Sequence, residues 1–478
     1  MFGTGSVPLC LMARVRCMPE RRMPAPAASS PAITRGDPVA DLIDERSLSR
    51  LQILVVGMMA AILVLEGLSL QMLSYATPAI LADWQVTELE FSPAVGLTKF
   101  GMAAGALIGA KFGDWWGRKP LLVGTTFLFS IATVSCAAAG DVPTLAALRL
   151  VEGAAFGACF PNAAALVAEW MPRRARSQAI GIMTAGIPVG GMLGAVIAMI
   201  VIERWGWQGC FLIGGFLPMA LGFLVLWSMP ESPSWTARRA KAGLSALLVR
   251  AWPKEDSSWV VPPAPDVQKN GVTKAGRILT KANARTNIAL WLCFFMNGFA
   301  VNGLILWGTT ALTGMGLDLK VAIGLGVPYN IASLAFTLGA SFVAARFGTR
   351  IVVLTLAATT VVALAMSAVL GLSETPSTIG IGALYIAAGG FMGGVQALLV
   401  VLAAHAYPTE SRSTGVGACS TVGRVSGIIS GFAGGAVLST VSPALFFAAL
   451  AGAAVFLVVG AMLTDRHMPA RSPGIGTS

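Results

Sequence analysis

The sequence predicts an all-α membrane protein in which twelve transmembrane helices form two six-helix, pseudo-symmetric bundles. Of the 478 residues, 55% are hydrophobic and only 12% are charged. A soluble chain of this length could not bury so much apolar surface, so lipid must be its main solvent. The other two observations are a series of apolar runs of membrane-spanning length and a pattern that occurs once in each half of the chain.

The repeated pattern indicates that the two halves are copies of one unit. The segment 169–177, EWMPRRARS, reappears as 405–413, HAYPTESRS, with its proline and its last arginine in the same places. The segment 114–119, DWWGRK, has a weaker counterpart in 345–350, ARFGTR. Both pairs run in the same order, so we infer two parallel repeats. One large group of secondary transporters is built in this way, with the substrate path between the halves.

A helix needs about 20 predominantly apolar residues to cross the hydrocarbon core of a bilayer. Twelve such runs are found, at 51–81, 91–112, 120–140, 143–169, 177–201, 208–229, 286–312, 320–345, 351–371, 376–405, 413–440 and 443–464. They define an N-terminal bundle (51–229) and a C-terminal bundle (286–465), joined by a polar linker (230–285). We expect residues 1–50 to be a mostly disordered cytoplasmic tail and 466–478 to be a short C-terminal tail.

Within the linker, residues 235–250 could form a short amphipathic helix. Leu244, Leu247 and Leu248 would lie on one side of it and could rest on the membrane surface. A flexible tether is the alternative.

The distribution of Lys and Arg sets the predicted orientation. The net charge is +11, and the basic residues gather in loops after even-numbered spans, whereas the other loops are mostly acidic. Cytoplasmic loops carry such a basic excess, so both termini are expected in the cytoplasm and the chain in a bacterial inner membrane. Nucleic-acid binding is disfavoured because the sequence has no basic patch interleaved with aromatic residues and no known reader motif. We expect the chain to act as a monomer.

The sequence offers little for a metal or a cofactor. Its seven cysteines form no CxxC pair, and only two histidines are present. We therefore expect no metal site and no cofactor. An enzyme is also not expected, because no nucleophile–base pair or metal cluster can be recognised.

Two residues form the candidate site at mid-membrane depth. Arg424 lies about 18 Å inside its predicted span, at 1.5 Å per residue, and its guanidinium could bind a carboxylate through two bonds. Glu66 lies near the middle of the first span, where a desolvated carboxylate could bind and release a proton. A structural ion pair between the halves is the alternative.

Other polar residues inside the spans are weaker candidates. Arg149 lies about two turns inside the fourth span, where a charge must face a partner or a water-filled cavity. Glu152, three residues on, could serve proton coupling or simply pair with Arg149. The remaining candidates could contact an aromatic substrate or only pack helices: Asn297, Asn302, Trp307, Tyr329 and Gln396.

A third group of residues lies in the basic loops and is predicted to form a cytoplasmic gate. Gly117 permits a tight turn, and Asp114 could cap a helix or pair with a basic residue that breaks away when the halves move. The predicted gate residues are Asp114, Gly117, Arg118, Glu169 and Arg176, with His405 and Arg412 in the corresponding places of the second half. His405 could relay protons, or it could make an ordinary hydrogen bond at the membrane edge.

These motifs resemble those of a known superfamily. The turn DWWGRK is similar to the signature loop of the major facilitator superfamily, G-x-L-A-D-R-x-G-R-K, although Ala110 and Trp115 depart from it. The runs PNAAALVAEWMP (161–172), GVQ (394–396), YPTESRSTGVG (407–417) and GRVSG (423–427) together resemble the aromatic acid:proton symporter family.

The resemblance implies a major facilitator fold and proton-driven import of a benzoate-like or hydroxybenzoate-like carboxylate. One departure concerns the first span, where that family usually has two acids, as D-G-x-D. Here Glu66 keeps one acid and Ser69 stands in place of the other. Efflux of a drug or metabolite by the same fold is the main alternative. A membrane sensor is disfavoured because such sensors attach a soluble output domain, and only a short tail is expected after residue 465.

Overall fold

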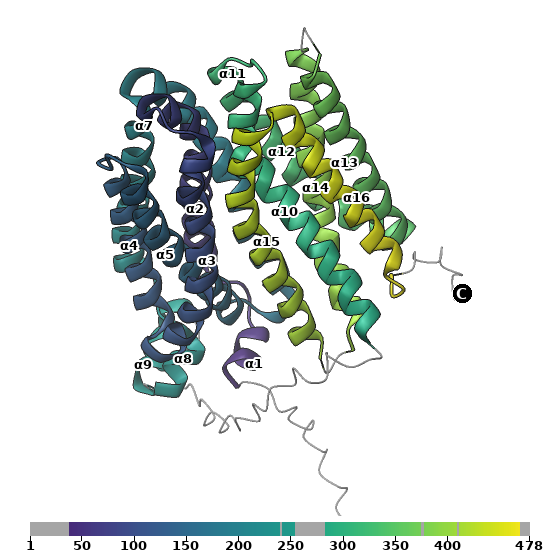
Figure 1. Cartoon of the computed structure of the whole chain (residues 1–478). Coiled ribbons are helices and arrows are strands. Elements are labelled where there is room, and N and C mark those ends of the chain that lie inside the picture. Colours follow the sequence, from purple (N-terminus) through teal and green to yellow (C-terminus); the bar gives the residue numbers. More distant parts are fainter. Residues whose placement is uncertain (1–37, 240, 254–282, 374–376, 409–410, 469–478) are drawn as a thin grey trace, which may run out of the picture.

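The computed structural model describes residues 38–239, 241–253, 283–373, 377–408 and 411–468, and over these ranges the regular structure is helical, with no strand (Figure 1). The N-terminal half consists of α2 (Arg50–Trp84), α3 (Glu88–Trp116), α4 (Arg118–Cys136), α5 (Val142–Trp170), α6 (Arg173–Thr184) and α7 (Gly186–Ser228). The C-terminal half consists of α10 (Ala284–Gly314), α11 (Leu319–Gly324), α12 (Gly326–Phe347), α13 (Thr349–Gly371), α14 (Thr378–Ala406), α15 (Arg412–Thr440) and α16 (Pro443–Leu463). The two groups stand side by side as two bundles (Figure 1).

Eleven helical segments in the described ranges are long and apolar enough to cross a membrane. One of them, 173–228, has 56 residues. At 1.5 Å per residue it would be about 84 Å long, far more than the roughly 30 Å of hydrocarbon. Gly206, with φ 66° and ψ −174°, breaks it into two pieces. The all-helical membrane fold is thus confirmed, and twelve spans remain a prediction that the break at Gly206 supports.

The two halves share a turn built around a glycine. Gly117 joins α3 to α4 with φ 114°, and Gly348 joins α12 to α13 with φ 82°. Positive φ values strain residues with a Cβ, so glycine is the residue that fits both places. These are the turns that the fainter sequence repeat pairs with each other.

One end of the molecule carries most of the basic loops, and we call it the basic end. It includes the turns at Gly117 and Gly348 and three short helices, α1 (Pro38–Asp44), α8 (Pro233–Arg239) and α9 (Lys241–Ala251), which lie at the bottom of Figure 1. We call the other end, where α11 lies, the opposite end.

The short helices differ from two expectations. Residues 38–44 are not a disordered tail but form α1, whose Val39 and Ile43 are buried. The predicted amphipathic helix is split into α8 and α9, and Leu244 and Leu248 are buried in the same cluster as α1 rather than resting on a membrane surface. That cluster also includes α2, α5 and α6, so these helices cap the N-terminal half. Residues 1–37 and 254–282 lie outside the described ranges.

The start of the C-terminal tail is also attached to the protein. The Thr349 backbone N–H donates to the Met468 carbonyl at 3.0 Å, and the Met468 N–H donates to the Thr349 hydroxyl at 2.9 Å. Arg466 donates from Nη1 to the Ala406 carbonyl at 3.0 Å. Residues 466–468 thereby provide hydrogen-bond partners for the backbone N–H at the start of α13 and for the last carbonyl of α14.

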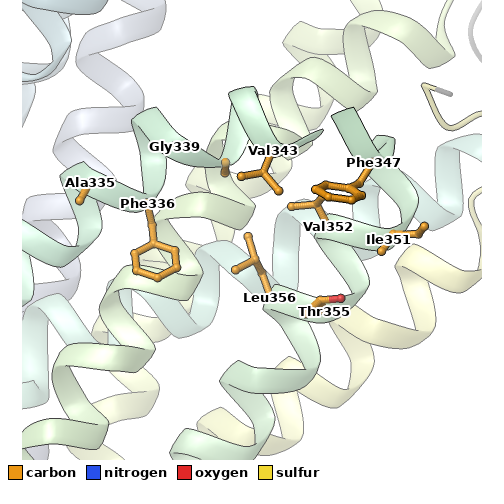
Figure 2. Close-up of a pocket in the computed structure, with 10 residues that line it drawn as sticks. Ala335, Phe336, Gly339, Val343, Phe347, Ile351, Val352, Thr355 and Leu356 are labelled. Atoms are coloured by element: carbon orange, nitrogen blue, oxygen red, sulfur yellow. The ribbon is translucent and has the colours of Figure 1, made fainter. Parts of the chain in front are cut away.

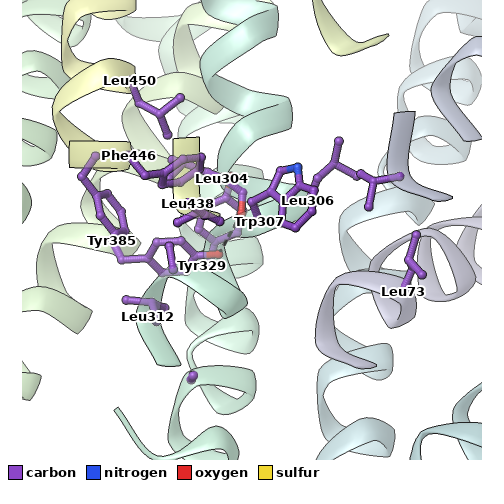
Figure 3. Close-up of a cluster of buried hydrophobic side chains, with 14 of the residues drawn as sticks. Leu73, Leu304, Leu306, Trp307, Leu312, Tyr329, Tyr385, Leu438, Phe446 and Leu450 are labelled. Carbon is purple, nitrogen blue, oxygen red and sulfur yellow. Dashed lines mark hydrogen bonds between the residues drawn. The ribbon is translucent and has the colours of Figure 1, made fainter. Parts of the chain in front are cut away.

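The largest buried cluster lies mainly in the C-terminal half and joins it to the N-terminal half at the opposite end (Figure 3). Trp307 and the stacked rings of Tyr329 and Tyr385, whose centroids are 4.8 Å apart, form its centre. Leu73 of α2 approaches it from the other bundle. Large exposed apolar side chains cover much of the outer surface, as a lipid-facing protein requires.

Candidate functional site

A cavity of about 280 Å³ lies between the two halves. Its walls come from α2, α3, α5 and α7 on one side and from α10 and α15 on the other. The residues lining it are Leu70, Lys99, Met102, Ala103, Ala106, Phe156, Gly157, Phe160, Ile187, Asn302, Gly423, Arg424 and Gly427. Its composition is mostly apolar and aromatic, with few polar groups, which is typical of a site for a small organic ligand.

Two cationic side chains face this cavity from opposite halves. Lys99 belongs to α3, and Arg424 belongs to α15. These helices pack closely, since a Cβ on Gly431 would lie 2.9 Å from the Gly96 Cα. Continuing this antiparallel register places Lys99 and Arg424 about one helical turn apart. Within the described ranges neither cation has a hydrogen bond or an ion pair to protein, and no lining residue is acidic.

Arg424 was predicted from the sequence, whereas Lys99 was missed. The signal for Lys99 was present, because it is a lone cation in the apolar stretch 91–110. The second cation of the cavity is therefore Lys99 and not Arg149, which the sequence had suggested as a substrate contact.

Glu66 lies beside the cavity wall, in α2, one turn before the lining residue Leu70. It is only 3% exposed, and among the described residues its Oε2 atom has no hydrogen-bond partner. The thiol of Cys159, which precedes the lining residue Phe160, lies within hydrogen-bonding reach of its carboxyl group. A carboxyl group at this place, with no cationic partner in the part of the chain that the structure describes, could bind and release a proton.

Arg149 and Glu152 are brought together, but away from the cavity. Nη1 of Arg149 lies 2.5 Å from Oε2 of Glu152, and both side chains are buried. Ser69 donates to Glu152 Oε1 at 3.0 Å, and Arg149 Nε donates to the Thr98 hydroxyl at 3.4 Å. The guanidinium also lies over the ring of Phe211, 6.0 Å from its centroid. The pair thus fixes α2, α3, α5 and α7 to one another. Of the two roles considered for Glu152, the observed contact is the local ion pair with Arg149.

Of the other predicted substrate contacts, Asn302 lines the cavity, whereas Asn297, Gln396, Trp307 and Tyr329 do not. Asn302 lines the cavity and donates to the Gly298 carbonyl at 2.8 Å. Asn297 donates to Gln396 Oε1 at 2.6 Å and so links α10 to α14. Trp307 donates to the Gly431 carbonyl at 3.0 Å, and Tyr329 stacks on Tyr385. Trp307 and Tyr329 belong to the buried cluster of Figure 3 rather than to the cavity.

At the basic end, Arg118 is the centre of a polar network that includes three of the predicted gate residues. Its Nη2 lies 2.7 Å from Asp114 Oδ1 and 3.5 Å from Glu169 Oε1. Its Nη1 donates to Asn162 Oδ1 at 2.8 Å. The network ties α3, α4 and α5 together.

Glu231, at the start of the linker, completes this network and was not predicted. Its Oε1 accepts from the backbone N–H groups of Arg118 at 2.9 Å and Lys119 at 3.1 Å, and so caps α4. The next residue, Ser232, donates to Glu169. Nothing in the run MPESPSW distinguishes such a cap from an ordinary loop acid.

The remaining gate candidates do not join the Arg118 network. Arg176 donates to the Met171 carbonyl at 3.5 Å, which closes the turn between α5 and α6. His405 and Arg412 are exposed at the basic end of the C-terminal half. Thr349 stands in the place of Arg118 in the second repeat, so within the described ranges the Arg118 network has no counterpart in the C-terminal half.

Among the described residues, two sets of polar contacts join the halves, and both lie toward the opposite end. The Gln71 and Asn330 amides exchange two hydrogen bonds, of 3.1 and 3.0 Å. Lys320 Nζ lies 2.9 Å from Glu203 Oε2 at the surface. These contacts attach the two halves to each other.

Known proteins resemble this chain over most of its length. The gallate transporter of Pseudomonas putida is 29% identical, and the match covers 91% of this chain and 96% of that protein. The 4-hydroxybenzoate transporter PcaK of Pseudomonas aeruginosa is 29% identical, with 90% and 97% covered. The 3-(3-hydroxy-phenyl)propionate transporter of Escherichia coli is 29% identical, with 80% and 86% covered.

Solved structures agree on the fold. The inward open xylose transporter XylE of E. coli superposes with a TM-score of 0.69 at 15% identity, covering 85% of this chain and 95% of that one. The family model of the Major Facilitator Superfamily matches residues 59–431. The chain therefore belongs to the Major Facilitator Superfamily and is a membrane transporter rather than an enzyme.

Proposed function

We propose that this protein carries an aromatic carboxylate across the membrane and that the carboxylate binds in the cavity between Lys99 and Arg424. The observation that carries the proposal is the cavity itself, which has two cations, no acidic lining residue and two phenylalanines. A carboxylate would neutralise both cations, and Phe156 and Phe160 offer faces for an aromatic ring. The named activities of the relatives support the same class of substrate.

The proposed mechanism is alternating access. The Gln71–Asn330 and Lys320–Glu203 contacts hold the halves together at the opposite end. We infer that the structure represents a state whose cavity is reached from the basic end. Because basic loops face the cytoplasm, this is the inward-facing state, with both termini in the cytoplasm of the inner membrane. Twelve spans and a monomeric carrier belong to the same proposal.

The proposed driving force is the proton gradient, with Glu66 as the coupling group. Its carboxyl group is buried, has no cationic partner within the described ranges and lies beside the cavity wall. Glu152 is a weaker candidate, because Arg149 and Ser69 already bind both of its oxygen atoms. Ser69 thus helps to position Glu152 and does not supply the second acid that the related symporter family carries.

Transport by the purified protein in liposomes tests the proposal. Radiolabelled 4-hydroxybenzoate and gallate should accumulate in the compartment opposite an imposed acidic side, and a protonophore should abolish the accumulation. Benzyl alcohol, which has the ring but no charge, should not compete. Accumulation that does not depend on the pH gradient would refute proton coupling. Accumulation of the substrate on the acidic side would favour the efflux alternative.

A further inference from the structure

A second cavity, of about 470 Å³, lies on the outer side of the C-terminal half, between α12 and α13 (Figure 2). The side chains of Phe336, Val343, Phe347, Ile351 and Leu356 point into the space between the two helices. Nine of the ten lining residues are apolar or glycine, and Thr355 is the exception. We call this cavity the α12–α13 groove. It is separate from the cavity that holds Lys99 and Arg424.

The groove has the length of one membrane leaflet. It extends along α12 from Phe347, at the basic end, to Ala335. The twelve residue-to-residue steps between them correspond to about 18 Å, and one leaflet of the hydrocarbon core is about 15 Å thick. Phe347 is 52% exposed and Ile351 61%, so the described chain leaves the groove open toward lipid. An acyl chain entering from the basic end would fill it.

Two arginines lie at the mouth of the groove. Arg346 and Arg350 flank the Gly348 turn, next in sequence to the lining residues Phe347 and Ile351, and both are exposed. Within the described ranges neither has an ion pair or a hydrogen bond, although the Arg346 guanidinium lies 5.5 Å from the centroid of the Phe347 ring. Two guanidinium groups at the membrane boundary are complementary to a phosphate.

The N-terminal half shows why these arginines are available. In the corresponding turn, Arg118 is bound by Asp114 and Glu169. Ala345 takes the place of Asp114 in the second repeat, and Thr349 takes the place of Arg118. The C-terminal turn therefore lacks the acid, has a cation, Arg350, in the place of Lys119 and adds a second, Arg346, in the place of Trp115. An anionic ligand could neutralise both.

We propose that the α12–α13 groove binds an anionic phospholipid of the leaflet at the basic end, with one acyl chain in the groove and the phosphate between Arg346 and Arg350. The site goes beyond the proposed transport function. It relies on that proposal only for the orientation, which makes this leaflet the cytoplasmic one, where anionic lipids attract basic residues.

Photo-crosslinking in liposomes tests the site. The intact protein is reconstituted with a trace of phosphatidylglycerol that carries a diazirine in one acyl chain, and labelled peptides are identified by mass spectrometry. We expect adducts on the peptide spanning 335–356. Removing one guanidinium, in Arg346→Gln or Arg350→Gln, should reduce labelling about fivefold, because one basic residue near an anionic surface typically contributes about 1 kcal/mol. The same probe on a phosphatidylcholine should label this peptide weakly.

A filled groove provides the second test. Gly339 lines the groove, and a Cβ there would have no atom within 4 Å, so Gly339→Leu should fill the groove without disturbing the helices. Gly124 of α4, which is exposed and equally open, provides the matched control Gly124→Leu. Labelling should be lost in Gly339→Leu and kept in Gly124→Leu.

Three results would overturn the proposal: equal labelling by both headgroups, unchanged labelling in Gly339→Leu, or a protein dimer that Gly339→Leu dissociates. The last would show that a second copy of the chain covers the groove. Uptake of labelled 4-hydroxybenzoate, measured on the same samples, separates a failure of this site from a failure of the transport proposal.

Discussion

Lys99 and Arg424 approach one cavity from helices that belong to opposite halves of the chain. A ligand that binds both cations would therefore hold the two halves together at mid-membrane depth. In an alternating-access carrier the halves move relative to each other. A ligand that binds both cations therefore stabilises the state in which the halves close around it. The pair thus connects substrate binding with the movement of the bundles.

Removing either cation should weaken substrate binding. For Lys99→Gln and Arg424→Gln we expect KM for the transported carboxylate to rise roughly tenfold or more, since a hydrogen bond to a charged group contributes about 1.5–3 kcal/mol. Arg424→Lys should show a smaller rise, because it keeps the charge and loses only the planar fork. Initial rates of uptake in liposomes, measured over a range of substrate concentrations, give these values.

Lys111→Gln is the matched control for these variants. Lys111 is also a cation on α3, but it is exposed at the basic end and does not line the cavity. Its substitution should leave KM unchanged. Equal effects at Lys99 and Lys111 would mean that general surface charge, not a binding site, determines affinity.

Neutralising Glu66 should uncouple transport from the proton gradient. Glu66→Gln keeps the size of the side chain but cannot ionise. We expect it to lose accumulation driven by a pH gradient and to retain part of the exchange of labelled for unlabelled substrate, because exchange needs no net proton release. Normal accumulation in Glu66→Gln would exclude this residue as the coupling group and direct attention to Glu152.

The sequence was sufficient for the fold because the relevant forces are local. A run of about 20 apolar residues crosses a bilayer whatever its neighbours are, and the repeat at Pro172 and Pro408 relates the halves without any knowledge of packing. The break at Gly206 is also local, and it lies between the predicted spans 177–201 and 208–229.

Contacts between elements were harder to predict, since they depend on helix register. Arg149 and Glu152 are three residues apart, so their pairing could be anticipated from helix geometry. Nothing in the sequence shows, by contrast, that Trp307 donates to Gly431 or that Tyr329 stacks on Tyr385. An aromatic side chain inside a span suits a binding site as well as it suits a helix interface, so residue type alone does not separate the two roles.

The linker cap provides a prediction about stability. Glu231→Ala removes the carboxylate that accepts from the backbone N–H groups of Arg118 and Lys119. Loss of a helix cap usually costs about 1 kcal/mol, so the apparent Tm of the detergent-solubilised protein should fall. Glu203→Ala, at an exposed ion pair on the opposite end, should change Tm much less. An equal fall in both variants would contradict the role of Glu231 as a cap.

The amide pair at the opposite end provides a prediction about conformation. In Gln71→Leu the Oδ1 atom of Asn330, a residue only 3% exposed, loses its donor in the closed state, whereas Nδ2 still donates to the Gly326 carbonyl. An unsatisfied buried polar group costs about 1–3 kcal/mol, so the population should shift roughly fivefold to a hundredfold toward the state that is open at the opposite end. A cysteine introduced at Ser74, one turn beyond Gln71 and buried in this structure, would then react faster with a membrane-impermeant maleimide added from that side.

The double variant Gln71→Leu/Asn330→Leu separates this explanation from a general loosening of the helices. Replacing both amides by apolar groups of similar size removes the unsatisfied partner, and such a change can be almost neutral. We therefore expect labelling of the cysteine at position 74 to return toward the rate seen without these substitutions. If the double variant instead reacts faster than Gln71→Leu alone, the amide pair is not what holds the opposite end closed, and the Lys320–Glu203 contact should be tested in the same way.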